Sequence, residues 1–447
     1  MPDFGGAVPP AAVSGADFER YADKVRNPGL LGKLAGGLVF ALFEDPRLLA
    51  AFFRRFAPIA HIRVFKPNPP QRGFWLVTRY DDVMEVLERN QDFPVPFDKP
   101  MRQLDRTGEN FILGMPNDDT YKAIHRETMK AFRLEDVPSI AKFAYQRADT
   151  ALAAAHKNRI DAIGGLLTMV PTEIVGRYYG IPVQDPNFAI LLIGMNLHSF
   201  PHLVTIPAAE PAALAAAARM GPLVDAAIAR AKAAAPDPNP ATILGRFVKA
   251  QQDDPKSVMT DDVIRSTIMG CMLGFIPTNN RASGQILRYL LKRPDVMERA
   301  IDAARSGDDD LLQRVLMEAL RFRPINPGPF RLVAQDTVIA SGQPRERKVP
   351  KDAMLMVATH SASFDPREVE DPNTFSDHRE LSDTMRFGWG QHFCIGYKIA
   401  VEQIAQTFKP LLERGPFRAV RGPLGKAKYY GGFYEHLHIE FGLESRS

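Results

Sequence analysis

One helical segment of unusual length constrains the fold of this chain more than any other feature. Its start is marked by Thr260, a good N-terminal capping residue, and by the acidic pair Asp261 and Asp262, whose charge suits the positive end of a helix. Its end is marked by Lys292, followed by an arginine and a proline. About 33 residues at 1.5 Å each make a rod of roughly 50 Å. A rod of this length must cross the core of the molecule.

Shorter elements surround this helix. Helical patterns dominate residues 117–292, and a further helix is predicted over residues 309–323, where Pro324 stops it. A short helix is predicted over residues 81–89, and the Pro-rich residues 91–114 are predicted to form a long loop. The predicted strands are few and short: residues 61–65, 74–78, 338–340 and 355–358. The sequence therefore predicts an α+β fold that is mainly helical, with small sheets, in one large domain.

Composition narrows the class of protein. Of 447 residues, 45% are apolar and 24% are charged, as in an ordinary globular protein, and the net charge of +4 is too small to favour nucleic acid. The two cysteines, Cys271 and Cys394, lie far apart, which argues against a disulfide framework and suits a reducing cytosol. The start of the chain lacks the basic and apolar parts of a signal peptide, and the apolar run at residues 30–43 is too short to span a bilayer. We therefore expect a soluble, cytoplasmic monomer without a transmembrane anchor.

Cys394 lies in a glycine-rich loop directly before a helical pattern. The loop reads Phe387-Gly-Trp-Gly-Gln-His-Phe-Cys-Ile-Gly396, and the helix is predicted from Tyr397 onward. Backbone N–H groups and the dipole at a helix N-terminus favour a negative charge, so a thiolate would be stabilised at this position. Glycines allow the backbone to approach a flat partner closely. A thiolate with N–H groups directed at its sulfur is what a haem iron needs from an axial ligand; the alternative is a buried structural cysteine.

This loop resembles the haem-binding loop of the cytochrome P450 superfamily, Phe-Gly-x-Gly-x-His-x-Cys-x-Gly, at every fixed position. The resemblance implies haem b (iron protoporphyrin IX) as cofactor, with Cys394 as the iron ligand. It implies a single haem domain over residues 1–447, with a long central helix that crosses the haem, an extended segment at about residues 1–25, and no fused reductase. Residues of the loop implied to contact the cofactor are Phe387, Gly388, His392, Ile395 and Gly396.

The resemblance extends to charged residues elsewhere. Glu318 and Arg321, three apart on one predicted helix, match the family's Glu-x-x-Arg pair, and Arg379 matches the arginine that completes it. Together they are expected to fix the segment that supports Cys394. Haem propionates need cationic or hydrogen-bonding partners, and the matching positions add Arg331, Tyr121 and His125 to His392. Tyr121 departs from the family because bacterial relatives often carry a histidine there, and tyrosine has no positive charge.

The long helix departs from the family at its oxygen-activating signature of small residue, Gly, any residue, acid and Thr. On Leu273-Gly274-Phe275-Ile276-Pro277, the acid position is Ile276 and the alcohol position is Pro277. Neither side chain can relay a proton. Pro277 breaks the helix ladder and frees the carbonyl of Leu273, so a groove for oxygen with water as the relay is expected. Candidate catalytic residues are therefore Pro277, Thr278 and Asn279, with Asn280 as a further possibility.

Three catalytic functions remain open. The first, which we favour, is a monooxygenase that hydroxylates a lipophilic small molecule (a terpenoid, fatty acid or aromatic) with dioxygen and electrons from a separate ferredoxin and ferredoxin reductase. The second is a peroxygenase driven by hydrogen peroxide, and the third is a hydroperoxide isomerase; a non-catalytic haem sensor is a distant fourth. A basic stripe at Lys122, Arg126 and Lys130 suits an acidic ferredoxin. The expected substrate pocket is apolar: Ile112, Leu113, Leu273, Phe275, Ile276, Pro329 and Phe433.

Overall fold

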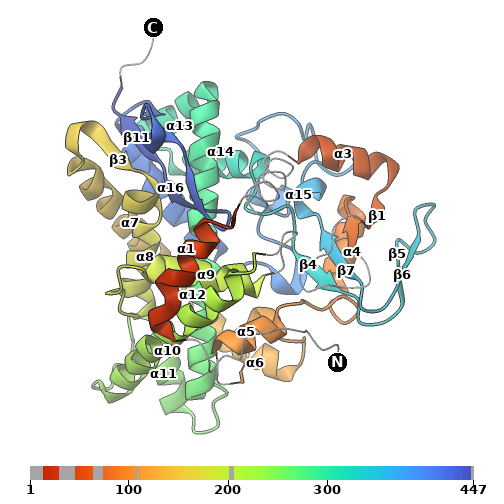
Figure 1. Cartoon of the computed structure of the whole chain (residues 1–447), viewed down its shortest axis with the longest axis horizontal. Coiled ribbons are helices and arrows are strands. Elements are labelled where there is room, and N and C mark those ends of the chain that lie inside the picture. The colour runs from red at the N-terminus through yellow and green to blue at the C-terminus, as the bar shows by residue number, and fades with distance from the viewer. Residues whose placement is uncertain are drawn as a thin grey trace.

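The computed structural model describes residues 14–29, 46–63, 74–105, 108–109, 111–200 and 206–443. Helices dominate this part of the chain (Figure 1). They are α1 (Phe18–Arg26), α3 (Arg47–Phe56), α4 (Tyr80–Glu88), α5 (Asp98–Asp105), α6 (Asp119–Ala131), α7 (Val137–Ala153), α8 (Met169–Ile174), α9 (Phe188–Ser199), α10 (Ala209–Ala233), α11 (Ile243–Asp253), α12 (Asp261–Lys292), α13 (Pro294–Ser306), α14 (Asp309–Phe322), α15 (Thr359–Ala362) and α16 (Tyr397–Glu413).

The strands form four small sheets. The largest has the order β1-β2-β7-β4, with β2 parallel to β7 and the other two pairs antiparallel. The remaining sheets are β3-β11-β8, β10-β9 and β5-β6. Their bounds are β1 (Ile59–Ile62), β2 (Phe74–Val77), β3 (Arg159–Asp161), β4 (Phe330–Leu332), β5 (Thr337–Ile339), β6 (Arg347–Val349), β7 (Met354–Val357), β8 (Phe417–Ala419), β9 (Lys428–Tyr430), β10 (Phe433–His436) and β11 (His438–Phe441).

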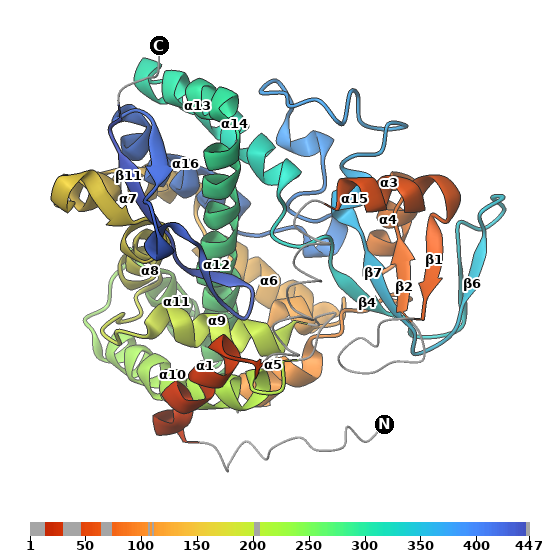
Figure 2. The same ribbon diagram turned by 45° about the horizontal axis from the view of Figure 1, so that its top comes forward.

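Helix α12 is the long element that the sequence predicted. Thr260 caps it by accepting a hydrogen bond from the N–H of Val263 at 3.2 Å, and it ends at Lys292. It passes through the middle of the helical part of the molecule, while the four-stranded sheet lies to one side with α3, α4 and α15 (Figure 2). Most of its side chains are buried. The expected α+β, mainly helical architecture is confirmed.

Two local expectations are corrected. Residues 18–26 form the amphipathic helix α1, with Phe18, Ala22 and Val25 buried on one face, where an extended segment was expected. The long loop expected over residues 91–114 contains α5, which buries Met101 and Leu104. In both cases the tertiary contact of a short apolar stripe stabilises a helix that periodicity alone did not reveal. The apolar run at residues 30–43 and the turn between β1 and β2 lie outside the described residues.

Helix α10 is the one described helix that is long and apolar enough to cross a membrane by length and composition. However, 61% of its apolar window is buried inside the protein, where it packs against α9 and α12. It also contains Pro222. These observations identify α10 as a core helix.

Candidate functional site

The loop around Cys394 adopts a fold that depends on its glycines. The N–H of Cys394 donates to the carbonyl of Phe387 at 2.9 Å and closes the loop. Gly388 and Gly390 have φ values of +85° and +66°, in the left-handed region that other residues rarely adopt. At Gly390, an added Cβ would lie 3.3 Å from the carbonyl oxygen of Leu87. The loop therefore needs glycine at both positions for its turn and its close packing on α4.

The Cys394 thiol faces two opposing influences. Burial raises its pKa to about 11, while a hydrogen bond from the N–H of Gly396 acts to lower the pKa. Gly396 directly precedes α16, so this N–H belongs to the helix start. Such a thiol stays protonated at neutral pH by itself, whereas a bound metal cation would displace the proton.

A cavity of about 950 Å³ lies between this loop and α12. The expected pocket residues Ile112, Leu113, Phe275, Pro329 and Phe433 line it. Two other expected residues do not: Leu273 and Ile276 are buried elsewhere, at 5% and 0% exposure. Helix geometry explains this correction, because the cavity-facing residues Gly270, Gly274 and Thr278 repeat every four positions and so share one face.

Thr278 supplies a hydroxyl on the cavity wall. It lies one residue after Pro277, which occupies the family's alcohol position. Its Oγ1 donates to the carbonyl of Gly274 and lies 3.1 Å from that of Phe275. An alcohol therefore lines the cavity at Thr278, one of the candidates that the sequence offered. Pro277 is buried in α12 and is not part of the cavity wall.

The asparagines beside Thr278 are occupied by structural hydrogen bonds. Asn279 lines the cavity, but its amide donates to the carbonyl of Phe275 at 2.8 Å and accepts from Gln403. Asn280 pairs with the backbone of Tyr434 in both directions, at 2.8 and 3.0 Å. These contacts hold α12 against α16 and β10.

Proline removes a helix hydrogen bond, and another helix replaces it here. The carbonyl of Leu273, which Pro277 leaves without its helical donor, accepts from Nδ2 of Asn196 at 3.0 Å. Asn196 comes from α9 and is 5% exposed. The expected free carbonyl is therefore satisfied by protein. Asn196 also lines the cavity, and the sequence gave no signal for it.

Four polar side chains gather where haem propionates would need them. Arg331 on β4 is 2% exposed, and its Nε has no hydrogen-bond partner among the described residues. Burial lowers its pKa to about 10, yet arginine remains charged. Burial, together with the charges of Arg331 and His125, lowers the pKa of His392 to about 3. Tyr121 donates to the carbonyl of Gln391 at 3.2 Å, and its ring lies beside both histidines.

No Asp or Glu is found among the described residues that line the cavity. A buried guanidinium without a counter-charge is costly, so the arrangement calls for an anionic partner that the protein itself does not provide. The two carboxylates of haem b meet this need, and a cysteine lies on the same cavity. The residues present therefore fit the cofactor.

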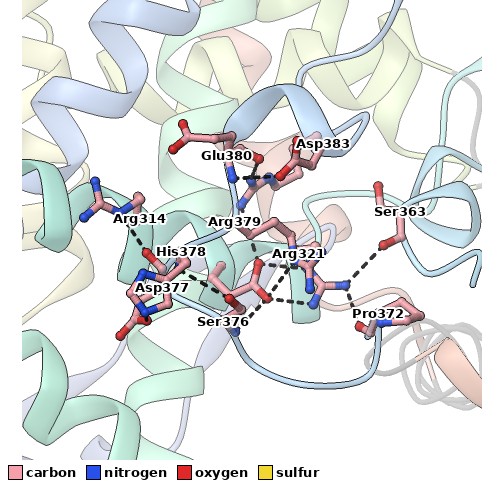
Figure 3. A network of polar contacts seen from close by, with 12 residues as sticks. Arg314, Arg321, Ser363, Pro372, Ser376, Asp377, His378, Arg379, Glu380 and Asp383 are labelled. Carbon is pink, nitrogen blue, oxygen red and sulfur yellow. Dashed lines mark hydrogen bonds and ion pairs between the residues drawn. The ribbon is translucent and has the colours of Figure 1, made fainter. Parts of the chain in front are cut away.

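Behind the loop, three guanidiniums lie within ion-pair distance of Glu318. Figure 3 shows two of these arginines, Arg321 and Arg379, in their network of polar contacts. Arg321 donates to Glu318 from Nε and from a terminal nitrogen, at 2.8 and 2.6 Å. Arg379 approaches to 3.5 Å, and Arg386, which the sequence analysis missed, to 4.0 Å. Arg321 also donates to backbone carbonyls of the irregular segment, including that of Pro372 at 2.8 Å. The structure thus brings together the predicted trio and ties it to the chain that leads to Cys394.

Comparisons with known proteins show which proteins this chain is similar to. The family model for Cytochrome P450 matches residues 215–418. The chain is 26% identical over 401 residues to cytochrome P450 107B1 of Saccharopolyspora erythraea, covering 83% of this chain and 91% of that protein. It is 23% identical over 365 residues to vitamin D(3) 25-hydroxylase of Pseudonocardia autotrophica, covering 80% and 83%.

Among solved structures, an intact type IV self-sufficient cytochrome P450 monooxygenase aligns with a TM-score of 0.71 at 21% identity. The alignment covers 90% of this chain but only 52% of that longer one. This likeness shows the fold. The family model and the relatives, together with this fold, support assignment of the chain to the cytochrome P450 superfamily of haem-thiolate oxidoreductases, whose cofactor is haem b.

Proposed function

We propose that the protein, as a single haem domain, is a monooxygenase that hydroxylates a lipophilic small molecule with dioxygen and electrons from a separate ferredoxin and reductase. One observation carries the proposal: Cys394 and the cavity-facing side of α12 border the same largely apolar cavity. When bound, the haem iron supplies the chemistry of dioxygen activation. The remaining tasks, to hold the cofactor, orient the substrate and exclude water, belong to the chain.

Each of these tasks has residues suited to it. Cys394 is the proposed iron ligand, and Arg331, His392, His125 and Tyr121 are the proposed partners of the propionates. Phe387, Gly388, Ile395 and Gly396 line the same cavity, so we propose them as cofactor contacts. Apolar side chains from residues 111–113, Phe275, Pro329 and Phe433 would enclose the substrate.

Thr278 is the proposed group that holds a proton-bearing water at the site. Its hydroxyl is anchored on two carbonyls of α12, so its oxygen is held at the cavity wall with capacity to accept from a water molecule. Pro277, once a catalytic candidate, can act only indirectly by shaping the helix. Asn279 can act only if it gives up its contacts with Phe275 and Gln403.

The proposed electron donor is an acidic ferredoxin that docks on α6. Lys122, Arg126 and Lys130 are exposed at spacing four on this helix. Two of these charges are partly neutralised by local ion pairs, Lys122 with Asp119 at 3.2 Å and Lys130 with Glu127 at 2.7 Å. A docking partner would compete for both lysines, so we expect affinity that falls with ionic strength. Such a donor implies a soluble protein in the cytoplasm.

Peroxide-driven chemistry, as a peroxygenase or isomerase, is the second candidate. It is favoured by the lack of a carboxylic acid among the described residues of the cavity wall, because delivery of protons to dioxygen is the step that such an acid would serve. The two candidates differ in the oxidant they need.

Two measurements test the proposal. Reduced protein with carbon monoxide should show the long-wavelength absorption of thiolate ligation, and Cys394→Ala should abolish it while Cys271→Ala retains it. Turnover with NADH, ferredoxin and reductase should then consume NADH and yield hydroxylated product. Fast turnover with hydrogen peroxide and none with reductant would favour the second candidate. A haem sensor would turn over with neither.

A further inference from the structure

Arg281 adds a positive charge to the cavity wall, where it packs against β10. It follows Thr278 by three residues on α12, so both share the cavity face and their Cα atoms are separated by about 4.5 Å along the helix axis. Arg281 is partly exposed, and it lines the cavity. Its guanidinium carbon lies 5.6 Å from the centre of the Phe433 ring on β10.

Within the described part of the chain, no carboxylate pairs with Arg281 and no acceptor receives a hydrogen bond from it. Other arginines of the cavity wall differ: Arg26 binds Glu435 at 2.8 Å, and Arg321 binds Glu318. The groups that would act electrostatically on Arg281 are the phenols of Tyr429 and Tyr434, and phenols are neutral at ordinary pH. Among the described residues, only the aromatic face of Phe433 therefore offsets the charge of Arg281.

The amide closest in register on α12 is held by other partners. Gln285, one helical turn after Arg281, accepts at Oε1 from the hydroxyl of Tyr434 at 2.9 Å and donates to the carbonyl of Pro324 at 3.2 Å. Oε1 of Gln285 thus accepts from Tyr434, and no hydrogen bond joins it to Arg281 among the described residues. Burial lowers the pKa of Arg281 but leaves it protonated. A cation on the wall of a largely apolar cavity is costly to keep without an anionic partner.

The propionate site is a separate group of residues. The charges that lower the pKa of His392 are those of Arg331 and His125, which come from β4 and α6. Arg281 faces β10 instead. The two propionates of the cofactor would pair with Arg331 and the residues around His392. Arg281 would still lack an anionic partner.

We propose that Arg281 binds the carboxylate of the substrate, so that the substrates are lipophilic organic acids. Arg and carboxylate form strong, directional, charge-assisted hydrogen bonds, and the ring of Phe433 would shield the pair from water. The apolar part of the acid would extend along Gly274 and Phe275 toward the wall at residues 111–113. This assignment deepens the proposed function and rests on it only for the reaction that follows binding.

Binding by the haem-loaded protein, measured by calorimetry without reductant or peroxide, tests the assignment. The probes are matched pairs that differ in charge: decanoate with decan-1-ol, and 4-phenylbutyrate with 4-phenylbutan-1-ol. We expect at least one acid to bind more tightly than its alcohol. Arg281→Met should weaken that acid on the order of 10- to 100-fold and leave its alcohol within about threefold. Arg281→Lys should retain part of the preference. Arg421→Met, the same change on the surface, should alter neither.

Two kinds of result would overturn the assignment. The first is a wild-type protein that binds neither acid more tightly than its alcohol, or a preference that survives in Arg281→Met. The second is a melting temperature that falls in Arg281→Met with equal loss of acid and alcohol, which identifies a structural residue; a charge held for a ligand predicts an unchanged or higher melting temperature. An acid preference that depends on Arg281 in a protein without monooxygenase activity would refute the proposed function and leave this inference standing.

Discussion

Glu318 accepts two hydrogen bonds from Arg321 one turn later on α14, at 2.8 and 2.6 Å, and both side chains are almost completely buried. Arg379 and Arg386 also lie within 4.0 Å of Glu318, so three cations share one carboxylate. Glu318→Gln removes that charge and leaves the guanidiniums buried together. We expect the free energy of unfolding in urea to fall by about 3–5 kcal/mol, with weakened haem retention, because a broken buried pair exposes the full desolvation cost.

A matched exposed pair provides the control. Asp253 binds Lys249 at 2.6 Å on the surface of α11. Asp253→Asn should cost less than about 1 kcal/mol, because solvent screens exposed ion pairs. Equal losses in the two variants would show that the Glu318 cluster does not support the loop.

Much of this architecture could be predicted, because local chemistry determines it. The cap at Thr260 and the stop after Lys292 fixed the limits of α12, and Pro324 fixed the end of α14. The loop of Cys394 could be predicted since its glycines are needed for backbone reasons that hold in any context. By contrast, α5 in residues 91–114 depends on apolar contacts that only the tertiary structure supplies.

Alignment with the family's oxygen-activating signature could not show which residues of α12 face the cavity. Pro277 was assigned to the alcohol position, but the helix turns Gly274 and Thr278 to the cavity and buries Ile276 and Pro277. A helical count from Thr278 would have found Arg281 and Gln285 on the same face. Their roles depend on partners from β10 and the segment after α14, which no sequence spacing reveals.

Substitutions at Thr278 and Asn280 should distinguish a catalytic side chain from a structural one. Thr278→Ala removes the cavity hydroxyl, so we expect product formed per NADH to fall roughly tenfold or more, with hydrogen peroxide released instead; proton-relay groups commonly contribute this much. Thr278→Ser should retain coupling. Asn280→Ala loses hydrogen bonds to Tyr434 and Thr168, so it should cost about 1–3 kcal/mol of stability with coupling unchanged. Equal coupling in Thr278→Ala and wild type would remove Thr278 from the mechanism.

His198 on α9 should make stability fall in mild acid. Burial lowers its pKa from 6.5 to about 4, and its Nε2 lies 3.1 Å from the side-chain oxygen of Gln103. Between these two pH values the unfolded chain binds a proton that the folded protein refuses, so the free energy of unfolding decreases as pH falls from 6.5 to 4. We expect His198 to account for a loss on the order of 2 kcal/mol over that range.

Urea unfolding of wild type and His198→Gln at pH 7, 5.5 and 4.5 measures this term. The variant should lose less stability in acid than wild type, while His156→Gln, an exposed control, should follow wild type. If the three proteins lose stability in parallel, another group is responsible.

Two glycines of α12 predict opposite outcomes for the same substitution. At Gly274 an added Cβ meets nothing within 4 Å, because it points into the cavity, whereas at Gly284 it would overlap the ring of Tyr434. Alanine favours a helix over glycine by about 1 kcal/mol, so Gly274→Ala should leave stability equal or slightly higher. Its methyl group narrows the cavity beside Thr278, and decan-1-ol should therefore bind more weakly.

Gly284→Ala should cost about 1–3 kcal/mol, since Tyr434 is fixed by Asn280 and Gln285 and cannot move freely. Urea unfolding and calorimetry on both variants test the pair; a destabilised Gly274→Ala with unchanged binding would mean that this face of α12 is packed against protein.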